Sequence, residues 1–413
     1  MSRTHRIRRL LPPVMPLLLL VCVAALPAGG AATTAAASAR PHDEVGVMAR
    51  ARQWQLPLLR LPEAWQASRG ERVLVAVLDT GVRTDHPDLG GAVVQGPNLT
   101  GASRRGGPWG HHGTAMASLI AGRGHGEGRR RGVLGVAPAA DVLSVRVTLE
   151  NSDPRREKLR SDGGDALARG IRYAVDHGAD VISMSLGGGS GAWEGSAAAE
   201  EAVQYAVGHG AVLVASSGND GDTANRKNFP AAYPGVIAVG AVDRRLRPAR
   251  FSNRQDYLSV VAPGTEIVTA GASGGYVVGD GTSSAAAMVA GIAALIKSAH
   301  PELSPYHIRR AIERGTRKRP PGGYSRSYGH GVANAALALR EARRLAGAAS
   351  MPALPGGYFG DGPPTGPPSS RTPVVVGMVL LVAALSARVV RRQRRSGKPA
   401  AGNPAAGLGH LTS

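Results

Sequence analysis

Three side chains that could carry out nucleophilic catalysis occur in this sequence, each next to a segment predicted to be a strand or a helix. Asp79 follows an apolar run at 73–78, His112 opens a helical segment at 112–121, and Ser283 opens another helical segment. A serine hydroxyl is a poor nucleophile at neutral pH, so it needs a base within reach, and the base needs an orienting carboxylate. Together the three residue types supply the parts of an acyl-transfer site.

The segment after Ser283 is apolar nearly all round, which is typical of a buried helix. A serine at its start lies among unpaired backbone N–H groups at the positive end of the helix dipole, where an oxyanion would be stabilised. Alone, Ser283 is better explained as an ordinary N-cap, but with Asp79 and His112 the catalytic interpretation is favoured. Asn219, at the end of another predicted strand, adds an amide donor for the oxyanion beside the backbone N–H of Ser283.

Short apolar runs alternate with helical segments through the middle of the chain. Continuous apolar runs are typical of strands buried on both faces, and their alternation with helices predicts a mostly parallel sheet covered on both sides, a three-layer α/β/α fold. Functional residues of such sheets gather beyond the carboxyl ends of the strands. The expected strands are 73–78, 142–147, 181–186, 211–215 and 236–242, and the expected helices are 112–121, 164–177 and 197–209.

Six motifs resemble those of the subtilisin superfamily of serine peptidases: LDTGV, DHPDL, HGTAMA, ISMSLGG, ASSGND and GTSSAAAMVAG. The resemblance spans roughly residues 60–340, and the order Asp, His, Ser is that of subtilisin. Within the superfamily, the chain resembles the mycosins, the membrane-anchored peptidases associated with type VII secretion. The features that carry this resemblance are QWQLPLLRLPEAW before the first strand, a Pro-rich linker and an apolar C-terminal segment. The resemblance implies a subtilisin-like fold and a protein or peptide substrate. Calcium often stabilises subtilisin relatives, but we identify no calcium-binding loop in the sequence, and we expect no cofactor.

The resemblance also assigns roles to individual residues. It implies that Asp79 orients the base, that His112 rather than His111 is the general base because the family pattern is His-Gly-Thr, that Ser283 is the nucleophile and that Asn219 is the oxyanion donor. It further implies a strand that pairs with an extended substrate and a second wall of the specificity pocket. The substrate-binding residues implied are Ser183, Ser185, Leu186, Gly187, Ala215, Ser216 and Gly218. The sequence departs from the family at Ala287, where a proline is usual.

Other classes of function are disfavoured by composition. The single cysteine, Cys22, excludes a disulfide framework, including the disulfides that mycosins usually carry. The histidines lack zinc-ligand spacing, and we expect no metal site. The formal charge of +20 is concentrated at the two ends, so we expect no nucleic-acid partner.

The two ends of the chain predict a membrane protein whose catalytic part faces outward. Basic, apolar and then small residues at the N-terminus are the pattern of a secretory signal, with a retained first helix as the alternative. Arginines after an apolar C-terminal segment place that end in the cytoplasm, with an amphipathic or disordered tail as the alternative. The expected divisions are a signal peptide at 1–39, an N-terminal extension at 40–70, a peptidase domain at 71–346, a linker at 347–372, a single transmembrane helix at 373–390 and a basic cytoplasmic tail at 391–413.

The function expected is that of a serine endopeptidase at the cell membrane, linked to the type VII secretion machinery. Two other hypotheses remain open at this stage. One is a catalytically idle, membrane-tethered scaffold of a secretion complex. The other is a membrane-anchored exopeptidase of general degradative function that serves nutrition. The sequence does not give the side-chain preference at the scissile bond, because the residues of the predicted pocket wall are merely small.

Overall fold

The structure is a computed structural model that describes residues 41–103, 109–156, 165–187 and 195–347. The predicted signal peptide, linker, transmembrane helix and basic tail lie outside the described residues.

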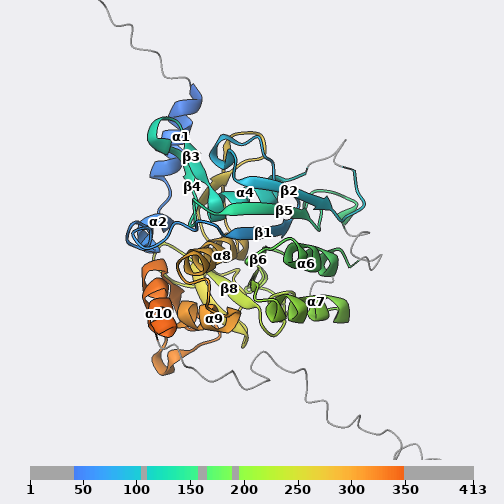
Figure 1. Ribbon diagram of the computed structural model, residues 1–413, viewed down its shortest axis with the longest axis vertical. Coiled ribbons are helices and arrows are strands. Elements are labelled where there is room, and N and C mark those ends of the chain that lie inside the picture. The colour runs from blue at the N-terminus through green and yellow to red at the C-terminus, as the bar shows by residue number, and fades with distance from the viewer. Residues whose placement is uncertain (1–40, 104–108, 157–164, 188–194, 348–413) are drawn as a thin grey trace, which may run out of the picture. The chain divides into compact units, whose positions relative to one another are not determined.

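A nine-stranded sheet crosses the described part of the chain (Figure 1). Its strands lie in the order β12-β13-β9-β8-β7-β6-β1-β5-β2, and every neighbouring pair is parallel except β12–β13. The predicted mostly parallel sheet is therefore confirmed. The strands are β1 (Leu74–Asp79), β2 (Val93–Asn98), β5 (Asp141–Arg146), β6 (Val181–Met184), β7 (Val212–Ser216), β8 (Ile237–Val242), β9 (Leu258–Pro263), β12 (Thr316–Arg317) and β13 (Val332–Ala333).

The strand order reverses at β1. The next two strands of this sheet along the chain, β2 and β5, lie on one side of β1. Strands β6 to β9 follow one another on its other side. Ligands of open α/β sheets bind beyond the carboxyl ends of the strands at such a reversal. Asp79 is the last residue of β1, so the topology places its carboxylate at the expected position for a site.

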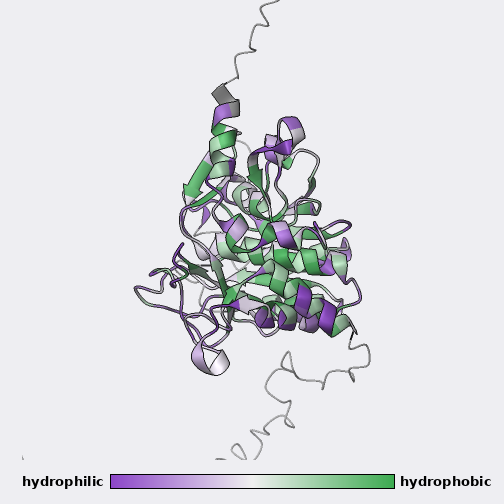
Figure 2. Cartoon of the chain, turned by 90° about the vertical axis from the view of Figure 1, so that its left-hand side faces the viewer, coloured by the Kyte–Doolittle hydropathy of each residue, from purple (hydrophilic) through white to green (hydrophobic). Residues whose placement is uncertain are grey.

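Alternate residues of each strand enter two separate cores, one on each face of the sheet. In β1, Val75 and Val77 contact the side of α4 and α8, whereas Ala76 and Leu78 contact the side of α6 and α7. In Figure 2 the apolar colour is concentrated in these inner elements. The covering helices are α4 (His111–Ala121), α6 (Ala166–Asp176), α7 (Ala197–Gly208) and α8 (Thr282–Ala299), and α9 (Pro305–Arg314) and α10 (Ala335–Gly347) pack against α8.

Two small antiparallel hairpins stand outside the main sheet: β3 (Arg123–His125) with β4 (Arg131–Leu134), and β10 (Ile267–Ala270) with β11 (Tyr276–Gly279). Three short 3₁₀ turns complete the elements: η1 (Pro87–Leu89), η2 (Glu127–Arg129) and η3 (Pro321–Gly323). The β10–β11 hairpin leads directly into α8 and so lies close to Ser283.

Helix α8 is long and apolar enough to cross a membrane by length and composition alone. However, 78% of its apolar window is buried inside the described part of the chain, as predicted for a helix that is apolar nearly all round. It is therefore a core helix of the described part of the chain.

The N-terminal extension is built into the fold. It forms α1 (Pro41–Ala51), α2 (Gln55–Leu58) and α3 (Leu61–Ala64), and α1 lies beside β3 and β4 (Figure 1). Leu59 and Leu61 are fully buried in the core on the side of α8. The side-chain amide of Gln53 donates to Leu134 O and accepts from Leu134 N, both at 2.9 Å. These contacts tie the extension to the β3–β4 hairpin.

Candidate active site

Asp79 and His112 meet where β1 ends and α4 begins. His112 Nδ1 lies 2.8 Å from Asp79 Oδ1 and 2.9 Å from Oδ2, and Asp79 is completely buried. Thr80 N also donates to Asp79 Oδ1, at 2.7 Å. Gly113 N donates to Thr80 Oγ1 at 3.1 Å, which fastens the first turn of α4 to the end of β1. The carboxylate therefore holds the imidazole in one orientation.

The contact with Asp79 sets the protonation of His112. A carboxylate only accepts hydrogen bonds, so Nδ1 carries the proton and Nε2 of the neutral ring has a free lone pair. Burial lowers the pKa of His112, whereas the charge of Asp79 and the hydrogen bond to it raise that pKa. The charge of Glu150 also raises it, and the charge of Arg156 lowers it. The net pKa lies above the usual 6.5. About 33% of the side chain remains exposed, so a substrate can reach the ring.

Ser283 is the second residue of α8, and its backbone N–H has no partner within the helix because it belongs to the first turn. Its carbonyl oxygen accepts a hydrogen bond from Ser185 Oγ at 3.0 Å, so α8 is joined to the segment after β6. Among the described residues, no hydrogen bond joins the Ser283 hydroxyl to His112, although both line the same cavity. Contacts of this kind often tighten only when substrate is bound.

Asn219 lies in the loop after β7 and lines the same cavity as Ser283. Its Oδ1 accepts from Thr282 N at 2.9 Å and from Thr282 Oγ1 at 2.8 Å. A backbone N–H can only donate, so the oxygen of the amide faces Thr282 and Nδ2 is left for another partner. A Cβ added to Gly281 would lie 3.6 Å from Asn219 Nδ2 and 3.7 Å from Ser283 N. The two N–H donors therefore border one small space.

A buried asparagine that the sequence analysis did not single out shapes this loop. Asn253 accepts from Asp220 N at 2.8 Å, and its Nδ2 donates to Arg226 O at 2.9 Å. A Cβ on Gly218 would lie 2.5 Å from Asn253 Nδ2, and Gly218 has a φ of +109°. Only glycine fits both requirements, which explains the Ser-Ser-Gly-Asn sequence before Asp220.

One cavity of about 510 Å³ joins the candidate catalytic residues, a volume typical of ligand sites. Three of the predicted substrate-binding residues, Ser185, Leu186 and Gly187, line it. Leu186 O accepts from Ser216 Oγ at 3.0 Å and from Asn228 Nδ2 at 3.3 Å. The segment after β6 and the segment after β7 are therefore locked together. The remaining wall comes mainly from the loop 148–156 and from the β10–β11 hairpin.

The other four predicted substrate-binding residues are not among those that line this cavity, and their role in substrate binding stays a prediction. Ser183 is 1% exposed and is paired in the sheet between Val77 and Val214, and Ala215 is likewise buried in β7. Ser216 and Gly218 are buried too. Ser216 donates to Leu186 O, and Gly218 packs against the side chain of Asn253.

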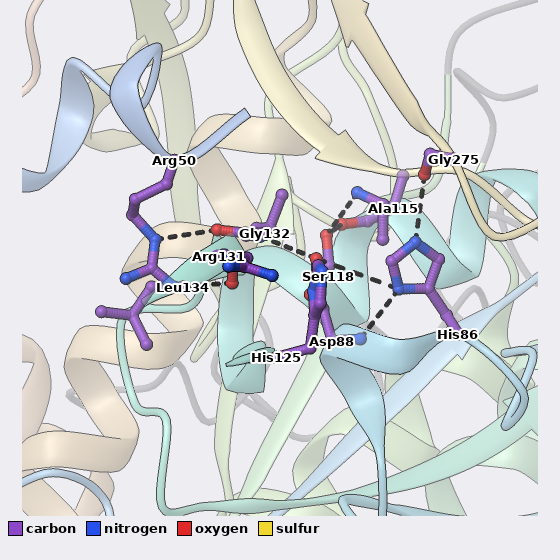
Figure 3. Close-up of polar contacts among 12 residues, drawn as sticks. Arg50, His86, Asp88, Ala115, Ser118, His125, Arg131, Gly132, Leu134 and Gly275 are labelled. Atoms are coloured by element: carbon purple, nitrogen blue, oxygen red, sulfur yellow. Dashed lines mark hydrogen bonds and ion pairs between the residues drawn. The ribbon is translucent and has the colours of Figure 1, made fainter. Parts of the chain in front are cut away.

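The β10–β11 hairpin is held in place by two buried polar side chains (Figure 3). Ser118 of α4 accepts from Ala270 N at 3.0 Å. His86 Nδ1 accepts from Asp88 N at 3.1 Å, so the ring proton lies on Nε2, which donates to Gly275 O at 3.0 Å. The hairpin wall is thereby fixed to α4, which carries His112, and to the start of η1, in the segment that follows β1 and Asp79.

Glu150 is a second carboxylate of the cavity, and the sequence analysis did not single it out. It is only 6% exposed, and its Oε1 accepts from the backbone N–H of His111 at 2.7 Å. The hydrogen bond anchors the first turn of α4, and the charge helps to raise the pKa of His112. Within the described residues, no three His, Cys, Asp or Glu side chains come together as a metal site would need.

The chain belongs to the subtilase family, whose model matches residues 70–331. Thermitase from Thermoactinomyces vulgaris is 36% identical over 263 residues, which cover 64% of this chain and 88% of thermitase. Among solved structures, MycP1 from Mycobacterium smegmatis has a TM-score of 0.58 and 29% identity, covering 69% of this chain and 84% of that chain. The MycP3 protease of the type VII (ESX-3) secretion system has a TM-score of 0.59 and 28% identity, covering 69% and 87%.

These similarities confirm the resemblance drawn from the motifs. The protein is a subtilisin-like serine endopeptidase that acts on protein substrates, and its structural neighbours include mycosins.

Proposed function

We propose that this peptidase cleaves peptide bonds with Ser283 as nucleophile, His112 as general base, Asp79 as the orienting carboxylate and Asn219 as an oxyanion donor. The observation that carries the proposal is the contact of both Asp79 oxygens with His112 Nδ1, in the cavity that Ser283 and Asn219 also line. That contact leaves Nε2 as the base, on the side of the ring away from Asp79.

The reaction follows from the placement of these groups. His112 Nε2 takes the hydroxyl proton as Ser283 attacks the peptide carbonyl, and Asp79 stabilises the imidazolium that forms. The carbonyl oxygen becomes an oxyanion, which Asn219 Nδ2 and the Ser283 N–H stabilise. His112 then gives its proton to the leaving amine, and water, activated by the same base, releases the acyl group from Ser283. The walls at 185–187 and 267–281 bind the extended peptide.

A fluorophosphonate probe tests this proposal without knowledge of the substrate. The probe reacts only with a serine that a neighbouring base activates, and we expect labelling of the folded full-length chain at Ser283. The site of labelling is read by peptide mass spectrometry. Unlabelled but folded protein would favour the catalytically idle scaffold instead.

Replacing Asn219 by alanine is expected to lower kcat by about 10²- to 10³-fold with little change in KM, because the lost donor acts on charge that develops only in the transition state. Steady-state kinetics on a peptide substrate measures this. Asn219→Asp is a matched variant, because it keeps an acceptor for Thr282 but removes the donor. Asp222→Ala, an exposed change three residues further on, serves as the control. A loss confined to KM would contradict the oxyanion role.

Glu150→Gln is expected to move the acidic limb of kcat/KM to lower pH. The neutral imidazole is the active base, and the negative charges of Asp79 and Glu150 raise the pKa of His112 against the opposing charge of Arg156. Removing the Glu150 charge therefore lowers that pKa, while glutamine still accepts from His111 N. The pH profile is compared with that of Glu201→Gln, a remote exposed carboxylate. An unshifted limb in the Glu150 variant would remove Glu150 from this role.

We propose further that the peptidase domain is held at the outer face of the cell membrane by the segment 373–390 and acts with a type VII secretion system. Support comes from the apolar run followed by arginines, from the secretory signal pattern at the N-terminus and from the likeness to MycP3 of the ESX-3 system.

Anchoring is tested by truncating the chain after residue 347. The full chain is expected to remain with membranes after alkaline carbonate extraction, whereas the truncated chain should be released and remain active. Release of the full chain would contradict the anchor. Co-purification of secretion components with the full chain but not with the truncated one would support the link to secretion.

A further inference from the structure

A second cavity lies apart from the catalytic one, where the N-terminal extension meets the β3–β4 hairpin. Its volume is about 490 Å³, and it shares no lining residue with the catalytic cavity. Five of the nine described residues that line it are arginines, and none is acidic. The arginines are Arg50, Arg69, Arg123, Arg129 and Arg130. Confining like charges around one cavity is unfavourable unless an anion occupies it, since each guanidinium keeps its charge.

Nearby carboxylates compensate only part of this charge. Asp141 accepts from Arg123 Nη2 at 2.8 Å but is 57% exposed, outside the lining. Glu71 accepts from the backbone N–H of Arg69, and Glu127 is exposed in η2. Asp88, which is also outside the lining, interacts electrostatically with Arg50. With five arginines and no acidic residue in its lining, the cavity keeps a positive potential.

Arg50 gives the cavity a fixed shape. Its Nε donates to Gly132 O at 2.8 Å, and its Nη2 donates to Arg131 O at 3.3 Å (Figure 3). The same Nη2 also donates to Arg129 O at 3.2 Å. The end of α1 is thus tied to the turn that carries Arg129 and Arg130. Arg129 has a φ of +55°, a strained value for a residue with a side chain, and the bond to its carbonyl helps to hold it there.

The other lining arginines differ in how firmly they are held. Arg123 also donates to Ala140 O at 3.4 Å, and the Arg69 guanidinium lies 5.0 Å from the centre of the Trp65 ring. Arg129 and Arg130 are exposed, and their side chains form no hydrogen bond or ion pair with the described residues. The guanidinium groups of Arg129 and Arg130 are therefore available for a ligand, and the turn that carries them is held in place by Arg50.

We propose that this cavity binds a phosphate group, either of a free polyphosphate such as pyrophosphate or of the headgroup of an anionic phospholipid. The guanidinium plane pairs with two phosphate oxygens at once, and several arginines can share the oxygens of one or two phosphates. A single carboxylate has too few oxygens and too little charge to satisfy this lining. The proposal does not depend on the catalytic assignment, because the two cavities are separate.

Titration of the full chain in a non-ionic detergent with inorganic pyrophosphate, followed by calorimetry, tests the site. We expect saturable binding that weakens as salt is added. Changing both Arg129→Gln and Arg130→Gln should weaken binding about 10- to 100-fold, because two charge-assisted contacts are lost. The control is Arg317→Gln with Arg319→Gln, which removes the same charge from exposed residues elsewhere and should leave the affinity unchanged. Peptidase turnover and the thermal unfolding midpoint should be normal in both.

The two sources of phosphate are separated by competition. If short-chain phosphatidylglycerol displaces pyrophosphate and short-chain phosphatidylcholine does not, the ligand is an anionic headgroup; if neither displaces it, the ligand is a free polyphosphate. Absence of saturable pyrophosphate binding, or equal binding by the Arg129/Arg130 variant and the wild type, would overturn the proposal.

Discussion

Ser283→Ala is expected to lower kcat about 10⁶-fold, the size of the loss that the same change causes in subtilisin, a member of this family. The hydroxyl is the only group of Ser283 that the change removes. The contact that holds this residue to the segment after β6 uses its carbonyl oxygen, which alanine keeps. Alanine is also well tolerated in a helix, so α8 should begin as before. The loss would therefore report on chemistry and not on folding.

The measurement is single-turnover cleavage of a peptide, with fluorophosphonate labelling of the same samples. Ser298→Ala is a matched control, since Ser298 lies on the same helix about 22 Å further along its axis. Its side chain donates only to Glu71. We expect normal turnover and labelling in the control and neither in Ser283→Ala. Turnover within a few-fold of the wild type would remove Ser283 from the nucleophile's role.

The sequence predicted the positions of Asp79 and Ser283 well because each stands at the end of a strongly marked element. A continuous apolar run predicts β1, and an all-apolar segment predicts α8, so their first and last residues follow within one or two positions. Sites form beyond the carboxyl ends of parallel strands, so this rule predicts that Asp79, at the carboxyl end of β1, belongs to the site. The structure agrees, with the reversal of strand order at β1.

The sequence predicted the end of β6 less well. Apolar character continues to Leu186, but the strand ends at Met184, because the chain turns at Gly187, where φ is +111°. A Cβ there would lie 2.2 Å from Asn228 Oδ1. The turn is thus decided by a residue more than forty positions away. For the same reason the motif alone could not separate Ser183, inside the sheet, from Ser185, in the cavity wall.

Residues that act through distant partners were invisible in the sequence. Glu150 follows an unremarkable strand, and its carboxylate becomes important only because the fold brings it to the first turn of α4. Asn253 lies in a polar loop and contributes only because Gly218 approaches it closely. Strand β9 was not predicted either, although all six of its residues are buried. Periodicity reports burial along one element, and contacts between elements require the fold.

Asp79→Asn is expected to lower kcat about 10⁴-fold by fixing the wrong tautomer of His112. Thr80 N donates to Asp79 Oδ1 at 2.7 Å, so in the variant the amide oxygen should keep that position. The amide NH₂ then takes the place of Oδ2, which lies 2.9 Å from His112 Nδ1. The position of Oδ1 is just as near, at 2.8 Å, but the amide hydrogens repel a proton on Nδ1 and so favour the tautomer with the ring proton on Nε2. In that tautomer the base can no longer take a proton from Ser283.

The variant should fold, since asparagine has nearly the same shape and keeps the acceptor for Thr80. The test is kcat measured across pH, with Asp256→Asn as the control, because Asp256 is an exposed aspartate that contacts Arg326. We expect the residual activity of the Asp79 variant to rise at high pH, where hydroxide replaces the missing base, and its His112 pKa, followed by NMR, to fall because a negative charge is lost. If instead kcat near neutral pH stayed within ten-fold of the wild type, the Asp79–His112 contact would be structural, and the orientation of the base would have to come from elsewhere.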